Sequence, residues 1–271
     1  MTLKVACVTG ANKGIGFEIT KKLVKEGFAV IMACRDLTAA KEAEIEVKKT
    51  VVNAHIEHVH VDLAVPESAS KAAGEVKKLF PGGIDVLINN AGFAYHWDSP
   101  EPFYNQAIQS IKINYYGTVA VCEAMLPLIK DGGRLVNVSS SSGSLVHLSN
   151  KDLIAKWKGC NSKDAIESLL NEFIELTKLK YNHLSAGWPD SAYGVSKLGV
   201  TTYTRVLGNL TPRVHIFSCC PGHCQTTMST FTGKKTAEEG ADTPVWLATS
   251  EEALHVIPQG GFATERRHIQ E

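Results

Sequence analysis

Two hydrophobic patterns alternate along the 271 residues of the chain. Short runs rich in β-branched residues predict strands, and the segments between them carry apolar residues three and four positions apart, which predicts amphipathic helices. The predicted strands are Lys4–Thr9, Ala29–Cys34, Glu57–Asp62, Val86–Asn89, Leu135–Ser139 and Val214–Cys219. Because runs such as Val86-Leu87-Ile88 are apolar at every position, helices should cover both faces of the sheet. The pattern predicts an α/β fold, a doubly wound parallel sheet of about seven strands, in one domain over residues 1–271.

One segment is longer than a simple crossover requires. About fifty residues separate the strand that ends near Ser140 from the helix near Tyr193, whereas a crossover needs about a dozen or more. Ser162 can cap a helix in this segment, and a shorter helix is predicted from Lys151 to Trp157. The inward face of the capped helix would carry Ile166, Leu169, Leu170, Phe173, Ile174 and Thr177. We predict a helical insertion at about residues 144–187, packed on the domain.

Composition and charge exclude several classes of protein. Hydrophobic residues make up 44% of the chain and charged residues 21%, as in soluble globular proteins. Lys plus Arg (28) equals Asp plus Glu (28), so no net charge favours nucleic acid or an acidic membrane surface. The longest apolar run, Phe28 to Cys34, is far shorter than the roughly 20 residues of a membrane helix. We therefore expect neither nucleic acid nor a membrane as a partner.

The cysteines indicate a reducing compartment and no metal. There are seven, an odd number, and most lie in strand-like runs, which favours free thiols over a disulfide framework. The first strand begins too near Met1 to leave room for a signal peptide, so we expect a cytoplasmic protein. No Cys-x-x-Cys pair is present, and we predict no metal site. A redox-sensitive Cys224 stays open as an alternative.

A glycine-rich turn follows the first predicted strand, and a helix begins directly after it. The turn has the sequence Thr9-Gly10-Ala11-Asn12-Lys13-Gly14-Ile15-Gly16. Gly10 allows a tight turn, and a side chain at Gly14 or Gly16 would block close approach of the backbone. Free N–H groups and the positive end of the helix dipole suit a pyrophosphate. An ordinary turn is the alternative, but the position between strand and helix favours phosphate binding.

Six motifs, in order along the chain, resemble those of the short-chain dehydrogenase/reductase family. The first is the Thr-Gly turn with its G-x-x-x-G-x-G spacing. The others are Asn89-Asn90-Ala91-Gly92, Asn114, Asn137-Val138-Ser139-Ser140 and Tyr193-Gly194-Val195-Ser196-Lys197, with Cys220-Pro221-Gly222 after the last predicted strand. The long insertion before Gly187-Trp188-Pro189 looks like that of the carbonyl reductase branch. The resemblance covers essentially the whole chain and implies a Rossmann-like fold and an oxidoreductase.

The resemblance implies four catalytic residues: Asn114, Ser140, Tyr193 and Lys197. Tyr193 would donate a proton to the substrate carbonyl oxygen, and Ser140 would hydrogen-bond the developing alkoxide. Lys197, four residues after Tyr193, shares a helical face with it, so its charge should lower the pKa of Tyr193. Lys197 would also bind the nicotinamide ribose, and Asn114 would hold a water linked to Lys197. Ser139 precedes Ser140 in an extended strand and should point the other way.

The residues around the predicted adenosine site favour NADPH over NADH. Cys34 stands where NAD-binding members of the family usually have a carboxylate, and Asp36 is too far along to replace it. Lys13 and Arg35 instead offer cations, which suit a 2′-phosphate. The full set of cofactor-binding residues implied by the resemblance is Gly10, Asn12, Lys13, Gly14, Ile15, Gly16, Arg35, Asp62, Leu63, Asn89, Ala91, Gly92, Tyr193, Lys197, Pro221, Gly222 and Thr226. Within it, Asp62 and Leu63 would border the adenine and Asn89 the adjacent ribose.

The substrate residues are predicted from motif position. Ser140 and Tyr193 would contact the carbonyl, and Trp97 and Met228 would line the cleft, as would Tyr95 and Trp188. Each of these side chains could equally be core or rim packing. His223-Cys224 replaces the aromatic residue common in carbonyl reductases, which implies a more polar pocket.

The resulting hypothesis is NADPH-dependent reduction of carbonyl compounds, namely aldehydes, ketones and quinones, to alcohols. The alternatives are an oxidoreductase for one natural-product ketone or alcohol, such as a terpenoid or alkaloid, and a non-catalytic NADPH-binding sensor. A Rossmann methyltransferase would not need Tyr193 and Lys197. Because the insertion covers the surface through which many family members form tetramers, the resemblance implies a monomer.

Overall fold

The computed structural model describes residues 3–179 and 181–270, and in these residues eight strands form one sheet. Their order is β3-β2-β1-β4-β5-β6-β7-β8, and every neighbouring pair is parallel except β7 and β8. The strands are β1 (Val5–Thr9), β2 (Ala29–Cys34), β3 (Ile56–His60), β4 (Ile84–Asn89), β5 (Ile129–Val138), β6 (His215–Cys220), β7 (Phe262–Thr264) and β8 (Arg267–Ile269). The order turns back at β1, which makes the sheet doubly wound, as the hydrophobic pattern predicts.

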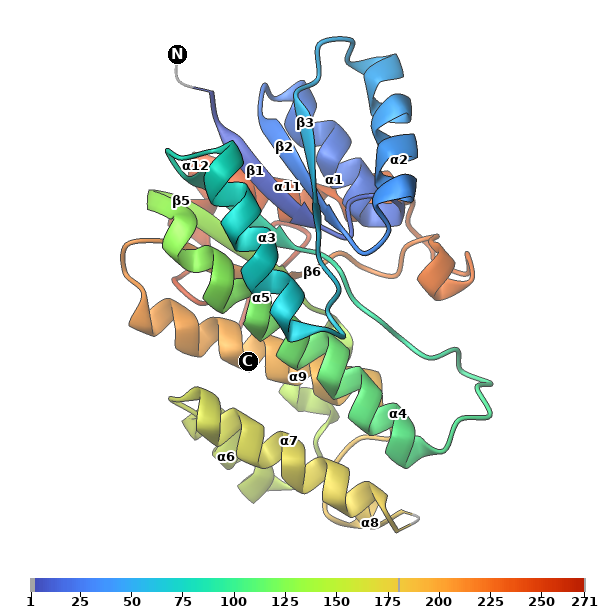
Figure 1. Cartoon of the computed structure of the whole chain (residues 1–271). Helices are drawn as coiled ribbons and strands as arrows, with labels where there is room; N and C mark the ends of the chain where they lie inside the picture. The colour runs from blue at the N-terminus through green and yellow to red at the C-terminus, as the bar shows by residue number, and fades with distance from the viewer. Residues whose placement is uncertain (1–2, 180, 271) are drawn as a thin grey trace.

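Helices cover both faces of the sheet (Figure 1). Consecutive strand residues alternate between two cores, because Cys7 packs with one helical layer while Ala6 and Val8 pack with the other. The layer over Ala6 and Val8 contains α1 (Gly14–Lys25), α2 (Leu37–Thr50), α11 (Asp242–Thr249) and α12 (Glu251–Val256). The layer over Cys7 contains α3 (Pro66–Leu79), α4 (Phe103–Ser110), α5 (Gly117–Met125) and α9 (Ala192–Leu210). None of the helices in the described residues has the length and apolar content needed to cross a bilayer.

Shorter helical segments connect these elements. A π-helix, η1 (Ile111–Tyr116), continues α4 into α5, and α10 (Ala237–Gly240) precedes α11. The 3-10 turns are η2 (Leu126–Leu128), η3 (Ser141–Gly143), η4 (Leu145–His147) and η5 (Thr227–Ser229). A π-helix inside longer helices often marks a functional site, and η1 carries Asn114.

The insertion contains α6 (Lys151–Gly159), α7 (Lys163–Thr177) and α8 (Asn182–Ser185). Ser162 caps α7 by accepting a hydrogen bond from the Ala165 backbone at 3.2 Å, as the sequence predicts. In Figure 1, α6 and α7 form a further layer outside α9. Gly199 makes this packing close, because a Cβ there would lie 3.2 Å from Leu170 of α7.

Aromatic side chains fill the space between the insertion and the rest of the domain. The rings of Phe173 and Trp188 are 5.2 Å apart, and those of Trp157 and Trp188 are 6.0 Å apart. Trp188 is only 2% exposed. The prediction that Trp188 lines the substrate cleft is therefore wrong, because its ring belongs to this core.

The hairpin of β7 and β8 was not predicted. Each strand has three residues, and they are joined by Glu265 and Arg266, whose φ angles of 49° and 58° are both positive. Two-residue turns of this type normally contain Asn or Gly, so Glu-Arg carries no hairpin signal. Ion pairs hold both side chains, with Lys235 bound to Glu265 at 2.7 Å and Asp242 bound to Arg266 at 2.8 Å.

Candidate active site

A groove runs along the carboxyl ends of the central strands, where ligands of such sheets bind. It consists of two adjoining cavities of about 600 and 200 Å³. The larger contains Arg35 and Asp62, and the smaller contains Tyr193 and Lys197. Both are lined by Gly10, Asn12, Lys13, Ala91, Gly92, Thr227 and Met228. Residues from five of the six motifs thus meet in one continuous groove.

The glycine-rich turn forms the floor where the two cavities meet. Gly10 and Gly14 have φ angles of +64° and +54°, which side chains rarely adopt. A Cβ at Gly16 would overlap the carbonyl oxygen of Gly10, so only glycine allows the helix to begin this close to the strand. The side chain of Lys13 does not cap α1, and the first N–H groups of the helix have no acceptor in the described residues. The turn therefore offers free donors to an anion.

Asn89 and Asn90 point in opposite directions. Asn90 lines the smaller cavity and braces the turn by donating to the carbonyl oxygens of Thr9 and Gly10 at 3.0 and 3.4 Å. Asn89 is 3% exposed, lines neither cavity and donates to Asn137 at 2.9 Å. The structure thus does not bring the Asn89 side chain to the predicted ribose site, because successive residues at a strand end face opposite sides.

The outer end of the groove carries free cations. Lys13 and Arg35 are both exposed, and neither forms an ion pair with any described residue. The carboxylate of Asp36 instead caps α2, accepting from the backbone of Thr38 and Ala39 at 2.9 and 3.0 Å. The Asp36 carboxylate therefore already has two donors at the start of α2, whereas Lys13 and Arg35 have no ion-pair partner among the described residues.

Three further predicted residues lie beside these cations. Asp62 and Leu63 line the same cavity, and Asp62 accepts from the Ala64 backbone at 2.9 Å. Cys34 is buried beneath the turn, where the backbones of Ala11 and Asn12 donate to its sulfur. Burial nevertheless raises the pKa of Cys34 to about 11, so the thiol is neutral and brings no negative charge to this end.

Tyr193 and Lys197 lie one turn apart on α9 at the inner end. Burial raises the pKa of Tyr193 to about 12, and a hydrogen bond with the Ser140 side chain opposes this only in part. The ammonium of Lys197 is 4% exposed, donates to the Val138 carbonyl at 2.8 Å and has a pKa lowered by burial to about 8. The site thus holds a neutral phenol beside an ammonium that no carboxylate neutralises among the described residues.

The prediction that Lys197 lowers the pKa of Tyr193 is wrong for this structure. The Nζ atom of Lys197 is 5.7 Å from the centre of the Tyr193 ring and is directed to the Val138 carbonyl. Burial, which removes hydration from the phenolate, instead raises the pKa of Tyr193, and the ammonium is not among the groups that shift it.

The two serines after β5 differ as the strand alternation predicts. Ser139 is buried, donates to the Lys197 carbonyl at 3.0 Å and pairs with the Thr201 hydroxyl at 2.7 Å. Ser140 is half-buried; its hydroxyl accepts from the Ser142 backbone at 3.1 Å and lies near enough to Tyr193 to lower the pKa of that phenol. Ser139 contributes atoms to the wall of the smaller cavity and Ser140 does not, so Ser140 is connected to the site through Tyr193.

The side chain of Asn114 forms three hydrogen bonds. Its oxygen accepts from the Phe93 backbone at 2.7 Å, and its amide donates to the Phe93 carbonyl at 2.8 Å and to Ser196 at 2.9 Å. These bonds tie the loop after β4 to α9. Because both amide hydrogens are used, the side chain could bind a water only through its oxygen, and that role stays a prediction.

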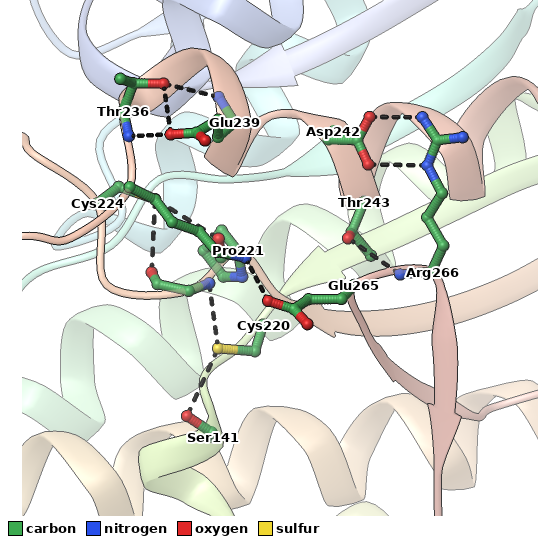
Figure 2. Close-up of polar contacts among 12 residues, drawn as sticks. Ser141, Cys220, Pro221, Cys224, Thr236, Glu239, Asp242, Thr243, Glu265 and Arg266 are labelled. Carbon is green, nitrogen blue, oxygen red and sulfur yellow. Dashed lines mark hydrogen bonds and ion pairs between the residues drawn. The ribbon is translucent and has the colours of Figure 1, made fainter.

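The loop after β6 closes the groove opposite the glycine-rich turn. Pro221 and Thr226 line the smaller cavity, and a Cβ at Gly14 would lie 3.3 Å from Thr226. Gly222 lines neither cavity and turns the chain with a φ of +86°. Figure 2 shows contacts around this loop, including the one between Cys220 and Ser141. The Gly222 backbone donates to the Cys220 sulfur at 3.4 Å.

Two inferences from the sequence of this loop are not supported. Cys224 is 4% exposed and burial raises its pKa, which opposes the thiolate that a redox-sensitive cysteine needs. His223 is exposed and lies against Thr232, at 3.5 Å. Neither residue lines the groove, so His223-Cys224 does not make it more polar.

Of the predicted substrate residues Met228 and Trp97, only Met228 lines the groove. Met228 lines both cavities and is 47% exposed. Trp97 is 90% exposed on the loop between β4 and α4 and lines neither cavity, so the structure does not bring it to the groove. Phe93, which the sequence reasoning missed, lines the larger cavity, and Tyr95 packs edge-on against it at 4.8 Å.

Comparisons with known proteins agree with this arrangement. Residues 4–151 match a family model described as short chain dehydrogenase. Carbonyl reductase (NADPH) 3 of Mus musculus is 40% identical over 256 residues, which is 90% of each chain. Carbonyl reductase (NADPH) 1 of Homo sapiens is 35% identical over 274 residues, covering 98% of this chain and 97% of the relative.

Two solved plant structures are also similar. Salutaridine reductase from Papaver somniferum superposes with a TM-score of 0.85 at 32% identity, covering 96% of this chain and 99% of that one. Menthone neomenthol reductase from Mentha piperita gives a TM-score of 0.81 at 30% identity, covering 97% and 98%.

Proposed function

The chain belongs to the short chain dehydrogenase family, and we propose that it reduces aldehydes, ketones and quinones to alcohols with NADPH. The names of the similar carbonyl reductases support both the cofactor and the substrate class. The observation that carries the proposal is that Tyr193 and Lys197 line the inner end of a groove, with Ser140 beside Tyr193, and that a glycine-rich turn with free N–H groups lines the same groove.

The residues of the groove fit NADPH. The free N–H groups at the start of α1 would hold the pyrophosphate, with Pro221 and Thr226 opposite. Lys13 and Arg35 would pair with the 2′-phosphate, which no carboxylate at the end of β2 repels. Asp62 and Leu63 would border the adenine. When bound, NADPH supplies the hydride that reduces the carbonyl carbon.

Tyr193 supplies the proton. With a pKa of about 12 its hydroxyl is protonated throughout the physiological range, which suits a general acid in the reducing direction. Ser140, bonded to the same hydroxyl, would orient it and donate to the substrate oxygen as negative charge develops there.

Lys197 stabilises the negative charge that Tyr193 acquires when its proton leaves. A buried ammonium interacts strongly with an anion because little water screens it. Its bond to the Val138 carbonyl fixes Nζ between β5 and α9, and a Cβ at Gly92 would lie 3.4 Å from it. Glycine at position 92 therefore leaves room for the ammonium beside a ribose.

The test is oxidation of NADPH, followed at 340 nm, against a panel of small aldehydes, ketones and quinones. We expect turnover of several members of the panel, and much weaker turnover with NADH. Turnover of a single natural-product ketone would favour the dedicated enzyme. Tight NADPH binding without any turnover would favour the sensor.

We also propose that the protein is a cytoplasmic monomer. Seven unpaired cysteines suit a reducing compartment, and α7 packs on the face of α9 that contains Gly199. Sedimentation at several protein concentrations should give the mass of one chain, whereas a stable tetramer would contradict the proposal. Fractionation of cells that express the chain should place it with the cytoplasmic enzymes.

A further inference from the structure

A third cavity lies outside the groove, between α6, α9 and the β7–β8 hairpin. Its volume is about 340 Å³, within the range of small-molecule sites. On α9 it begins at Thr201, one turn beyond Lys197, and continues to Arg205. Trp157 and Lys158 of α6 and Phe262 of β7 form other parts of the wall. The branch-specific insertion and the last hairpin therefore meet here.

The ionisable side chains in this wall are all basic. Arg205, Lys158 and His268 line the cavity, and no aspartate or glutamate does. None of the three forms an ion pair within the described residues. The Nη2 atom of Arg205 donates to the Trp157 carbonyl at 3.1 Å, which fixes the half-buried guanidinium and leaves other N–H groups for a ligand.

The uncharged part of the wall is mixed. Thr202 is 5% exposed, and its hydroxyl has no hydrogen-bond partner within residues 3–179 and 181–270. Gln259, by contrast, is satisfied, since its amide donates to the Val214 carbonyl at 2.7 Å and its oxygen accepts from Ile216. The apolar portion comes from Leu145, Trp157, Pro258, Phe262 and Ile269.

We propose that this cavity is a second ligand site, which binds a small organic anion. A carboxylate or phosphate head would pair with Arg205 and Lys158, which have no ion-pair partner in the described residues, and would accept from the unpartnered hydroxyl of Thr202. The body of the ligand would be aromatic or branched and would pack against the apolar wall around Trp157. A neutral or cationic ligand would leave the half-buried Arg205 and the exposed Lys158 without an ion-pair partner.

Intrinsic tryptophan fluorescence tests the proposal, because Trp157 forms part of the wall. The protein, saturated with NADPH to fill the groove, is titrated with benzoate and with phenyl phosphate, which separates the two anionic heads. Inorganic phosphate tests the head alone, and benzyl alcohol tests the body alone. We expect saturable binding of benzoate, phenyl phosphate or both, and at least about 10-fold weaker binding of phosphate and benzyl alcohol.

Two variants localise the site. Lys158→Gln and Arg205→Gln should each weaken the preferred anion by about 10-fold, while NADPH binds as before. Lys151→Gln, at an exposed lysine of α6 outside the wall, is the matched control and should bind like the native chain. Lys158 is exposed, so its variant reports on binding even if loss of the Arg205 bond disturbs folding. Equal affinity of benzyl alcohol and benzoate, absence of saturation, or unchanged affinity in Lys158→Gln would overturn the proposal.

Discussion

The two ends of the groove use charge in opposite ways. At the inner end, Tyr193 and Lys197 are removed from water, and burial moves the pKa of the phenol up and that of the ammonium down. At the outer end, Lys13 and Arg35 stand in water without ion-pair partners in the described chain. Proton transfer at the inner end thus depends on two buried groups, the Tyr193 hydroxyl and the Lys197 ammonium. The choice of NADPH over NADH at the outer end depends instead on exposed charges, which salt can screen.

The largest effect should come from Tyr193→Phe, which removes the proton donor and little volume. We expect turnover to fall by about 10³-fold, because general acid catalysis contributes about 10²–10⁴-fold. NADPH affinity, measured by fluorescence titration, should change by less than about threefold. Near-native turnover in this variant would contradict the role of Tyr193.

The adjacent serines provide a matched pair at the inner end. Ser140→Ala should lower kcat by about 10²-fold, since it removes one donor to developing negative charge. Ser139→Ala should leave kcat within about threefold and instead lower the free energy of unfolding by about 1 kcal/mol, because its bonds to Thr201 and Lys197 are structural. The reverse result would exchange the roles of the two serines.

Replacement of Lys197 by methionine should remove activity and increase stability. Lowering a lysine pKa from 10.5 to about 8 means that the charged form costs the folded state about 3 kcal/mol at pH 7. The lost bond to Val138 offsets about 1 kcal/mol, so Lys197→Met should be about 2 kcal/mol more stable in urea unfolding.

The stability difference between Lys197→Met and the native chain should depend on pH. The unfolded chain keeps its lysine proton up to about pH 10.5 and the folded chain only up to about pH 8, so the cost is full below pH 8 and shrinks between the two values. The stability advantage of Lys197→Met should therefore decrease from pH 7 to pH 9.5. Lys41→Met, at an exposed lysine, should show no such trend.

A smaller effect is expected at the outer end. The double variant Lys13→Gln, Arg35→Gln should reduce the preference for NADPH over NADH by about 10-fold, since each exposed pair contributes modestly. Raising the salt concentration should weaken NADPH binding to the native chain and have little effect on the double variant. An unchanged preference would show that other groups select the cofactor.

The smallest effect is expected at Trp97. Because its side chain is 90% exposed and outside both cavities, Trp97→Ala should change kcat/KM for the panel of carbonyls by less than about twofold. A large loss of kcat/KM would instead indicate that Trp97 contacts the substrate and that its loop closes over the groove.

The architecture could be predicted because its signals are local. Strands β1 and β2 are runs of five and six residues that are buried at every position, and Ser162 precedes a clear helical pattern. The hairpin of β7 and β8 could not be predicted, since its strands are short and tertiary ion pairs to Lys235 and Asp242, rather than turn residues, stabilise Glu265 and Arg266.

The candidate site could be predicted only in part, because a motif does not give the direction or the surroundings of a side chain. Strand alternation correctly separated Ser139 from Ser140, yet the same rule was not applied to Asn89 and Asn90. The pKa of Tyr193 depends on how much protein surrounds the hydroxyl, and spacing along a helix contains no such information.

The cap that Asp36 provides for α2 has an evolutionary consequence. A lineage that came to use NADH in place of NADPH would not need to alter the Asp36 carboxylate, which is already hydrogen-bonded to the start of α2. It would instead need an acidic residue at position 34, where the backbones of Ala11 and Asn12 already donate to the cysteine sulfur, and the loss of the guanidinium at position 35. Changes at two adjacent codons would then shift which pool of reducing equivalents the enzyme draws on, with Lys13 as the remaining cation.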